Sequence, residues 1–414
     1  MSPARSNTKG VILFLSNGQG EDLIAATVIE RLLREDFAWE VRALPLVGEG
    51  KAYSGIGIKL LATCRMMPSG GFAGFNLFWW AKDVASGWLG IFKEQIDILK
   101  KERAITDIVV CVGDVFPVLL SVLFLKKPII FLPTAKSDYA RFFKDHYRIE
   151  KWLMRRFCGL VLPRDKLTAS SLKRFGVNAI YIGNVMMDCL KISGERFGIE
   201  EDRYVVGILP GSKEEAYRNL PIILEAVKII NAKPFLSGKV DFLLALASSL
   251  NLERLGQVAS SRKNWILENS IGEERKKGIV ACLVSSSGIR IKIVQGKFGD
   301  VLNSSKVIIG LSGMGNEQAV GLGKAVVSFP TRGPQITKNF LYIQRLILGG
   351  AISIVEPSAE AVAEEVVTVL SHPEERERVL RIGKERMGNP GAAARVADLI
   401  KRELNKCFPQ RSQR

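Results

Sequence analysis

The stretch that decides the fold runs from Val307 to Gln318 and reads VIIGLSGMGNEQ. Its first part, Val307–Gly310, is apolar and predicts a buried strand, and a helix-like run begins at Gln318. The intervening turn is rich in small residues. Such a turn between a strand and a helix N-terminus presents backbone N–H groups and the positive end of the helix dipole, which together favour an anion. A tight strand-to-helix turn without a ligand is the alternative interpretation.

The same alternation of strand and helix extends over the whole chain. Apolar strand-like runs occur at Val11–Leu15, Val41–Leu46, Ile108–Val112, Pro128–Leu132, Leu160–Pro163, Ile180–Ile182, Tyr204–Leu209, Asp241–Ala247, Ile279–Val284, Ile291–Val294, Val307–Ile309 and Ala325–Phe329. Near-continuous apolar strands alternating with helices predict parallel sheets covered on both faces.

A polar, glycine-containing break follows the first half, so we predict an α/β protein of two Rossmann-like, doubly wound parallel-sheet domains that face each other across a cleft. The first, residues 1–192, is expected to face the acceptor and the membrane. The second, residues 203–388, is expected to bind a ligand that carries a diphosphate. Residues 389–414 are expected to form a C-terminal helix that crosses back to the first domain.

Composition narrows the class of partner. The chain has 414 residues, 47% of them apolar, which predicts a folded protein of more than one domain. A net charge of +17 favours an anionic partner, either a phosphorylated substrate or an anionic lipid surface. No compact basic block or aromatic RNA-binding signature occurs, so nucleic acid is not expected. Six cysteines without the paired spacing of a zinc site predict no metal centre and a reducing compartment.

The chain shows neither the order of a signal peptide at its start nor an apolar run of about 20 residues. The segment Met66–Phe92 instead mixes aromatic residues with glycines and nearby basic residues, which is typical of the interface of an anionic membrane. We expect a cytoplasmic protein peripheral to the membrane, with contacts through Phe75, Trp79, Trp80 and Trp88. A core helix pair beneath the first sheet is the alternative.

Two motifs of the first half carry candidate acceptor-side chemistry. Gly18 and Gly20 form a turn before a helix that starts at Asp22, and we expect this turn to approach an acceptor sugar. Leu23 replaces the third glycine of a dinucleotide fingerprint, so no nicotinamide or flavin cofactor is expected. Asp114 follows a buried strand and is placed for general-base work, with its pKa raised by apolar surroundings. Capping of a helix is the alternative role for both aspartates.

Two motifs of the second half carry candidate donor-side chemistry. Gly211, Ser212 and Lys213 follow the strand Tyr204–Leu209, and Lys213 is expected to meet a diphosphate, where charge develops as the leaving group departs. Arg332 borders the same edge and offers a second positive contact, with a solvated loop arginine as the alternative.

These motifs, taken in order, resemble the lipid-A-disaccharide synthase family and, more loosely, other GT-B glycosyltransferases such as the peptidoglycan N-acetylglucosaminyltransferase. The segments that carry the resemblance are Asn17–Asp22, Val112–Asp114, Ile182–Asp188, Leu209–Lys213 and Ser312–Glu317.

The resemblance implies a GT-B fold and a metal-independent, inverting transfer from a UDP-sugar, expected to carry an N-acetylglucosamine-type unit, to a lipid-linked acceptor. It implies Asp114 as the base, Lys213 at the diphosphate, Glu317 at the donor ribose, and no cofactor besides the UDP-sugar substrate. The donor-binding residues it implies are Gly211, Ser212, Ser312, Gly313, Met314, Gly315, Asn316, Glu317, Gln318 and Arg332.

The chain departs from the family where Lys213 replaces an arginine and Asn184 and Val185 replace a His-Pro pair. These departures favour a divergent member with a different acceptor. A soluble UDP-sugar epimerase of the same fold and a non-catalytic protein that binds nucleotide-sugar or lipid are the alternative functions.

Overall fold

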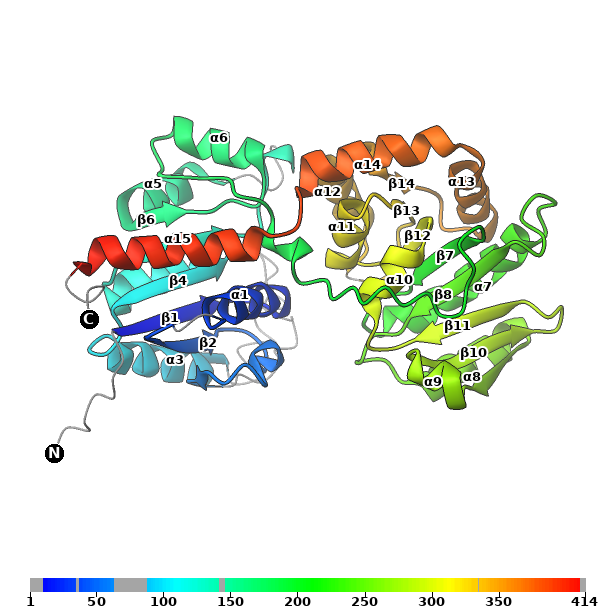
Figure 1. Cartoon of the computed structure of the whole chain (residues 1–414), viewed down its shortest axis with the longest axis horizontal. Helices are drawn as coiled ribbons and strands as arrows, with labels where there is room; N and C mark the ends of the chain where they lie inside the picture. The colour runs from blue at the N-terminus through cyan, green and yellow to red at the C-terminus, as the bar shows by residue number, and fades with distance from the viewer. Residues whose placement is uncertain (1–9, 35–36, 63–87, 141–145, 334, 410–414) are drawn as a thin grey trace. The chain divides into compact units, whose positions relative to one another are not determined.

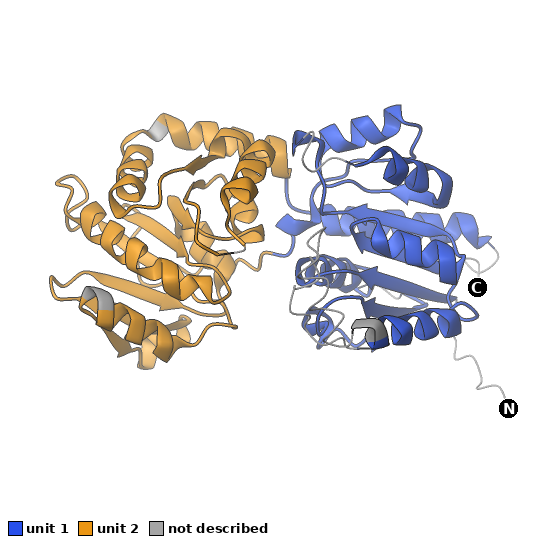
Figure 2. Cartoon of the chain, turned by 180° about the vertical axis from the view of Figure 1, so that it is seen from behind, with its two compact units in different colours: residues 1–189, 389–414 blue, residues 190–388 orange. Residues whose placement is uncertain are grey.

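The chain is described from a computed structural model. The described residues are 10–34, 37–62, 88–140, 146–333 and 335–409. They form two compact units, the first comprising residues 1–189 with 389–414 and the second residues 190–388 (Figure 2). Each unit is built on one β-sheet with helices on both faces (Figure 1).

The sheet of unit 1 is six-stranded and wholly parallel, in the order β3-β2-β1-β4-β5-β6. Its strands are β1 (Gly10–Ser16), β2 (Trp39–Pro45), β3 (Lys59–Leu60), β4 (Ile108–Gly113), β5 (Ile129–Pro133) and β6 (Cys158–Val161). Its helices are α1 (Gln19–Leu32), α3 (Trp88–Glu102), α4 (Phe116–Leu120), α5 (Arg148–Phe157), α6 (Lys166–Arg174) and α15 (Ala392–Cys407). The predicted strand at Ile180–Ile182 does not form; only Ala179 bridges to β6 there.

The alternation of side chains along β1 explains why the sheet is covered on both faces. Ile12 and Phe14 join the core formed with α1 and α15, whereas Leu13 and Leu15 join the opposite core with α3, α4 and α6. All four side chains are fully buried. Because successive strand residues point to opposite faces, a continuous apolar strand must have a helix layer on each side.

The sheet of unit 2 has eight strands in the order β14-β13-β12-β7-β8-β11-β10-β9. Its strands are β7 (Tyr204–Leu209), β8 (Val240–Ala245), β9 (Trp265–Asn269), β10 (Ile279–Ser285), β11 (Arg290–Val294), β12 (Val307–Gly310), β13 (Ala325–Ser328) and β14 (Ile352–Ile354). Its helices are α7 (Glu215–Asn231), α8 (Leu252–Lys263), α9 (Gly272–Lys276), α10 (Phe298–Ser304), α11 (Met314–Gly321), α12 (Lys338–Leu348), α13 (Ala359–Ser371) and α14 (Pro373–Met387).

The predicted parallel sheet of unit 2 carries an antiparallel extension at one edge. There β10 runs antiparallel to both of its neighbours, β11 and β9. Only residues 286–289 connect β10 to β11, with Gly288 in the left-handed region at φ +81°. A parallel connection needs a crossover of a dozen or more residues, so this short link can only make a hairpin.

Unit 2 begins earlier than the predicted residue 203. The Asp300 carboxylate accepts hydrogen bonds from the backbone N–H groups of Ser193, Gly194 and Glu195, at 2.7, 2.9 and 3.2 Å. The segment that the sequence marks as a polar break is therefore held on unit 2 by a buried side chain of α10.

The last helix lies in unit 1, where α15 packs against α1. Its start is fixed by the Asp188 carboxylate, which accepts from the N–H groups of Gly391 (2.5 Å) and Ala393 (3.0 Å). Because a helix N-terminus has unpaired N–H groups and a positive dipole end, a carboxylate stabilises it there.

Candidate functional site

Two turns of unit 2 emerge side by side at the carboxyl edge of its sheet. Parallel pairing sets Leu209, the last residue of β7, opposite Gly310, the last residue of β12. One residue further, the Leu311 N–H donates to the Leu209 carbonyl at 2.8 Å. We call residues 210–213 and 311–315, which follow these strands, the carboxyl-edge turns.

Glycine is required where the carboxyl-edge turns approach each other. Gly211 has φ +109°, and a Cβ there would lie 3.3 Å from the Leu311 carbonyl oxygen. Within the second turn, a Cβ on Gly315 would lie 2.7 Å from Ser312 Oγ, but the positive φ is confined to Gly211. Only glycine combines that backbone conformation with the close approach.

A pair of buried carboxamides braces the second turn from beneath. Asn316 Nδ2 donates to the Gly310 carbonyl (3.1 Å) and to Gln344 Oε1 (3.0 Å). Gln344 Nε2 donates in turn to the Gly313 carbonyl at 2.9 Å. Asn316 and Gln318 are expected from the sequence to contact a donor, but the structure buries both side chains. Both side chains are buried rather than on the outer surface of the turn, and its hydrogen bonds make Asn316 part of the framework of the turn.

The outward-facing groups of this edge are those with charge or backbone N–H. Ser212, Lys213 and Arg332 are exposed. Glu317, in the first turn of α11, is half-buried. The residues of the turn before it, Ser312, Gly313 and Met314, are half-buried as well. The Arg332 loop is held by the buried Glu215, whose carboxylate accepts from Thr331 Oγ1 (3.3 Å) and from the Gln335 N–H (3.2 Å). The sequence motifs of the second half thus meet at one edge of one sheet.

The candidate base of unit 1 lies at the carboxyl edge of β4. Asp114 Oδ1 accepts from Asn17 Nδ2 at 2.6 Å and from the Phe116 N–H at 2.8 Å. The first bond joins the turn after β1 to the turn after β4, and the second holds the start of α4. Burial raises the pKa of Asp114, and these two hydrogen bonds oppose that rise.

A second polar cluster, not found from the sequence, lies within electrostatic reach of Asp114. Lys136 Nζ donates to both oxygens of Glu150 at 2.8 Å, and His146 Nδ1 lies 3.4 Å from Glu150 Oε2. Burial acts to raise the pKa of Glu150, but the hydrogen bonds from His146 and Lys136 outweigh it and lower that pKa. Among the described residues, the buried His146 Nε2 has no hydrogen-bond partner.

Asp22, in the first turn of unit 1, is placed differently from its expected role. Gly18 precedes α1 with an extended φ of 172°, and Gly20 lies within the first turn of that helix. The Asp22 carboxylate does not face outward but is buried, accepting from Ser16 Oγ at 2.6 Å, with the Tyr53 hydroxyl 2.5 Å from the same Oγ. Burial raises the pKa of Asp22 to about 7. Asp22 is therefore a structural group rather than an acceptor contact.

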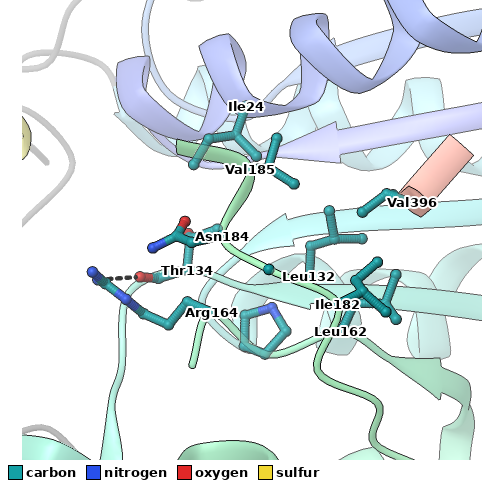
Figure 3. Close-up of a pocket in the computed structure, with 11 residues that line it drawn as sticks. Ile24, Leu132, Thr134, Leu162, Arg164, Ile182, Asn184, Val185 and Val396 are labelled. Carbon is teal, nitrogen blue, oxygen red and sulfur yellow. Dashed lines mark hydrogen bonds between the residues drawn. The ribbon is translucent and has the colours of Figure 1, made fainter. Parts of the chain in front are cut away.

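A small hollow separates the loop after β5 from the segment before the unit boundary (Figure 3). Arg164 Nη1 donates to the Thr134 carbonyl at 3.0 Å, and Asn184 lies beside this pair. The buried Asn184 Nδ2 lacks a partner among the residues described. The hollow offers about 20 Å³, which is room for one water molecule rather than for a sugar.

The predicted membrane contacts Phe75, Trp79 and Trp80 lie outside the described residues, and so does the side chain of Trp88, the first residue of α3. No helix in the described part of the chain combines the length and apolar character needed to cross a membrane. Within the same residues, no group of three His, Cys, Asp or Glu side chains is arranged to hold a metal ion.

A surface that the sequence did not single out lies on α5. Tyr147, Ile149 and Trp152 are 61%, 62% and 49% exposed. Basic residues accompany them on the same helix, namely Arg148, Lys151, Arg155 and Arg156. We call these seven residues the α5 surface. Large exposed apolar side chains among cations are typical of contact with an anionic lipid interface.

No protein-family model matches the chain. The lipid-A-disaccharide synthase of Geobacter sulfurreducens is 25% identical over 256 residues, which cover 56% of this chain and 59% of that protein. The aligned region spans about three fifths of the length of this relative. Two further lipid-A-disaccharide synthases are similar to the chain at the same level of identity, 25%.

Solved structures give the fold. The calicheamicin glycosyltransferase CalG4 superposes with a TM-score of 0.59 at 15% identity, covering 96% of this chain and 98% of that one. The UDP-GlcNAc 2-epimerase from Neisseria meningitidis bound to UDP-GlcNAc gives a TM-score of 0.54 at 16% identity, covering 95% and 100%. The chain accordingly has the two-sheet α/β architecture of the GT-B class.

Proposed function

We propose that the protein is an inverting, metal-independent glycosyltransferase that moves an N-acetylglucosamine-type sugar from a UDP-sugar to a lipid-linked acceptor. The observation that carries this proposal is the pairing of Leu209 with Gly310, which brings the two carboxyl-edge turns together. The names of the sequence relatives support a sugar transfer to a lipid. Open α/β sheets bind their ligands at this edge.

On this proposal unit 2 binds the donor. The backbone N–H groups of Ser312, Gly313 and Met314 at the N-terminus of α11 would hold the diphosphate, because the first N–H groups of a helix and its dipole favour an anion there. The exposed Lys213 and Arg332 would stabilise the negative charge that grows on the departing UDP. Glu317, in the first turn of α11, would accept hydrogen bonds from the ribose hydroxyls.

Unit 1 would supply the base. Transfer requires an acceptor hydroxyl oxygen to bond to the anomeric carbon while the bond from that carbon to the diphosphate breaks. The hydroxyl proton would pass to the Asp114 carboxylate. The raised pKa of Asp114 supports this role, because a base works best when its pKa lies closer to the pH of the reaction.

The α5 surface supports a lipid-linked acceptor. Its apolar side chains would enter the interface of an anionic membrane, while its basic side chains would meet lipid phosphates. The net charge of +17 acts in the same direction. We therefore place the protein at the cytoplasmic face of the membrane as a peripheral protein.

Thermal unfolding with UDP and with UDP-N-acetylglucosamine tests the donor half of the proposal. A ligand that binds the folded state raises its stability by about 2.7 kcal/mol at 100 times its Kd. We expect both ligands to raise the melting temperature, and a matched titration with AMP to raise it less. Absence of any shift at millimolar UDP would overturn the proposal.

A soluble UDP-sugar epimerase is the second candidate, favoured by the structural similarity to UDP-GlcNAc 2-epimerases. An epimerase would convert UDP-N-acetylglucosamine without an acceptor and would not bind anionic vesicles. Release of UDP that depends on added lipid acceptor identifies the transferase, whereas nucleotide binding with neither product identifies a non-catalytic binding protein.

A further inference from the structure

A second cationic site lies at the opposite edge of the unit 2 sheet from the carboxyl-edge turns. Arg203, Lys306 and Lys324 each come immediately before the first residue of a strand, respectively β7, β12 and β13. These three strands are parallel neighbours. Parallel pairing aligns their starts, because Val307 lies opposite both Val206 and Ala325. The topology therefore gathers three basic side chains at one amino-terminal edge.

These side chains line a hollow of about 430 Å³, which we call the amino-edge pocket. Its lining includes Arg196, Arg203, Lys306 and Lys324 together with Glu201 and the polar segment 303–305. A volume of this order holds a small molecule, and a polar, cationic lining suits one with several negative charges.

The two arginines of the amino-edge pocket are already neutralised. Arg203 forms an ion pair with Asp241, and Arg196 Nη1 lies 3.2 Å from Glu201 Oε1. The lysines are not neutralised in this way. Within the described part of the chain, neither Lys306 nor Lys324 forms an ion pair with a carboxylate.

Each lysine instead has a weaker, neutral partner. Lys324 Nζ donates to the Asn303 carbonyl at 2.8 Å, and Lys306 Nζ lies 4.9 Å from the centre of the Tyr204 ring. Burial, and then the charge of Lys306, lower the pKa of Lys324 to about 8. Burial and the nearby Arg376 likewise lower the pKa of Lys306, against the opposing charge of Asp202. Crowded and partly desolvated ammonium groups gain most from an added anion.

We propose that the amino-edge pocket binds a small anion carrying a phosphate or diphosphate group, with Lys306 and Lys324 as its main charged contacts. The site is separate from the proposed donor site, because strands β7 and β12 run from one to the other. The proposal does not depend on the function proposed above, since the pocket contains none of the residues assigned there.

Calorimetric titration of the full chain with pyrophosphate tests the proposal. All comparisons are made in a variant of the chain that carries Lys213→Gln and Arg332→Gln. These two substitutions weaken pyrophosphate binding at the carboxyl-edge turns. In that variant, Lys306→Gln with Lys324→Gln should reduce the affinity by about tenfold or more. The control is Lys276→Gln with Lys406→Gln, two lysines that are 75% and 72% exposed and pair with a glutamate three residues away. It removes the same charge and should change the affinity by no more than about twofold.

Chemical protection provides a readout that does not depend on the folding of a variant. The unmodified chain is treated with a limiting amount of an acetylating reagent at pH 8, and each lysine is quantified by mass spectrometry. Pyrophosphate should protect Lys306 and Lys324 by about fivefold or more while Lys276 and Lys406 stay unprotected. The proposal would be overturned if pyrophosphate left the labelling of Lys306 and Lys324 unchanged. It would also be overturned if Lys306→Gln with Lys324→Gln did not change the affinity for pyrophosphate.

A free anion and a lipid headgroup share this phosphate chemistry, so a second arm distinguishes them. Vesicles of phosphatidylglycerol and phosphatidylcholine in equal parts are tested for binding to the unmodified chain and to the pocket double variant. Vesicle binding that is lost in the double variant assigns the phosphate to a lipid. Vesicle binding that is retained, together with weakened pyrophosphate binding, assigns it to a soluble ligand.

Discussion

The β1–α1 segment of unit 1 and the β12–α11 segment of unit 2 are the same strand–turn–helix, held together by different chemistry. In each, the side chain six residues beyond the end of the strand folds back to bond it: Asp22 accepts from Ser16, and Asn316 donates to the Gly310 carbonyl. Unit 1 uses a carboxylate for this brace and unit 2 uses a carboxamide. The side chain that bonds back to the strand can therefore gain or lose a proton in unit 1, whereas in unit 2 it stays neutral.

The groups next to the two turns also differ between the units. The turn after β1 in unit 1 contacts a carboxylate, because Asn17 donates to Asp114, and the Lys136–Glu150 pair lies within electrostatic reach of Asp114. The turns of unit 2 present backbone N–H groups and the exposed Lys213 instead. The groups of unit 1 suit proton transfer and those of unit 2 suit a fixed anion, which is the division of labour that the proposed reaction requires.

Asp114→Asn should have the largest effect, because it removes the base but keeps the shape. We expect turnover to fall by about 10²- to 10⁴-fold, the usual contribution of a general base. UDP affinity, which belongs to unit 2, should stay within about twofold. Transfer assays and UDP titrations on the same preparation measure both quantities, and a loss of turnover below about tenfold would remove Asp114 from the reaction.

Asp22→Asn tests whether the Asp22 carboxyl group makes the stability of unit 1 depend on pH. The folded-state pKa of Asp22 is raised to about 7 from 3.8, so between these values the folded state keeps a proton that the unfolded state has released. The stability that Asp22 contributes is complete below pH 4 and is lost as the pH rises through 7, by about 4 kcal/mol in all.

Denaturant unfolding of the natural chain and of Asp22→Asn at pH 4, 6 and 8 measures this difference. The asparagine variant cannot lose a proton there, so its stability relative to the natural chain should rise from pH 4 to pH 8. A difference that is the same at all three pH values would show that Asp22 does not titrate in this range.

Asn316→Ala tests the brace of unit 2. It removes the Asn316 Nδ2 donor from the buried Gly310 carbonyl and from Gln344 Oε1, at a cost of about 1–3 kcal/mol in the free energy of unfolding. This loss should be independent of pH from 4 to 8, in contrast to that of Asp22→Asn. Asn339, which is exposed on α12, provides the control Asn339→Ala, with an expected change below about 0.5 kcal/mol. A pH-dependent loss in Asn316→Ala would contradict the comparison.

Lys213→Gln should have the smallest effect of the four. The side chain is exposed, so the loss of one charge contact should weaken UDP by about tenfold or less, and the loss should shrink as salt is added. Lys276→Gln on the same unit provides the matched control. Equal effects of the two substitutions would show that Lys213 acts only through net charge.

The sequence predicted the strands and turns of both sites because short apolar runs and small-residue turns are local signals. It placed Asp114, Gly211 and the turn at Ser312 correctly at strand ends. It missed the partners that come from distant segments: Glu150 lies 14 residues from Lys136, and Gln344 lies 28 residues from Asn316. It also assigned Asp22 and Gln318 to ligand contacts although both side chains are buried, because helix position alone does not tell which side chain faces the core.

The order of apolar runs and glycine turns by itself determined that this chain is a two-unit α/β protein with small-residue turns at its strand ends, since strand and helix periodicity and backbone freedom are properties of adjacent residues. Only the tertiary structure decided which polar side chains are buried as braces and which face outward. It also decided that the starts of β7, β12 and β13 bring Arg203, Lys306 and Lys324 together. Parallel register and burial are set by packing between distant segments, so no local pattern contains them.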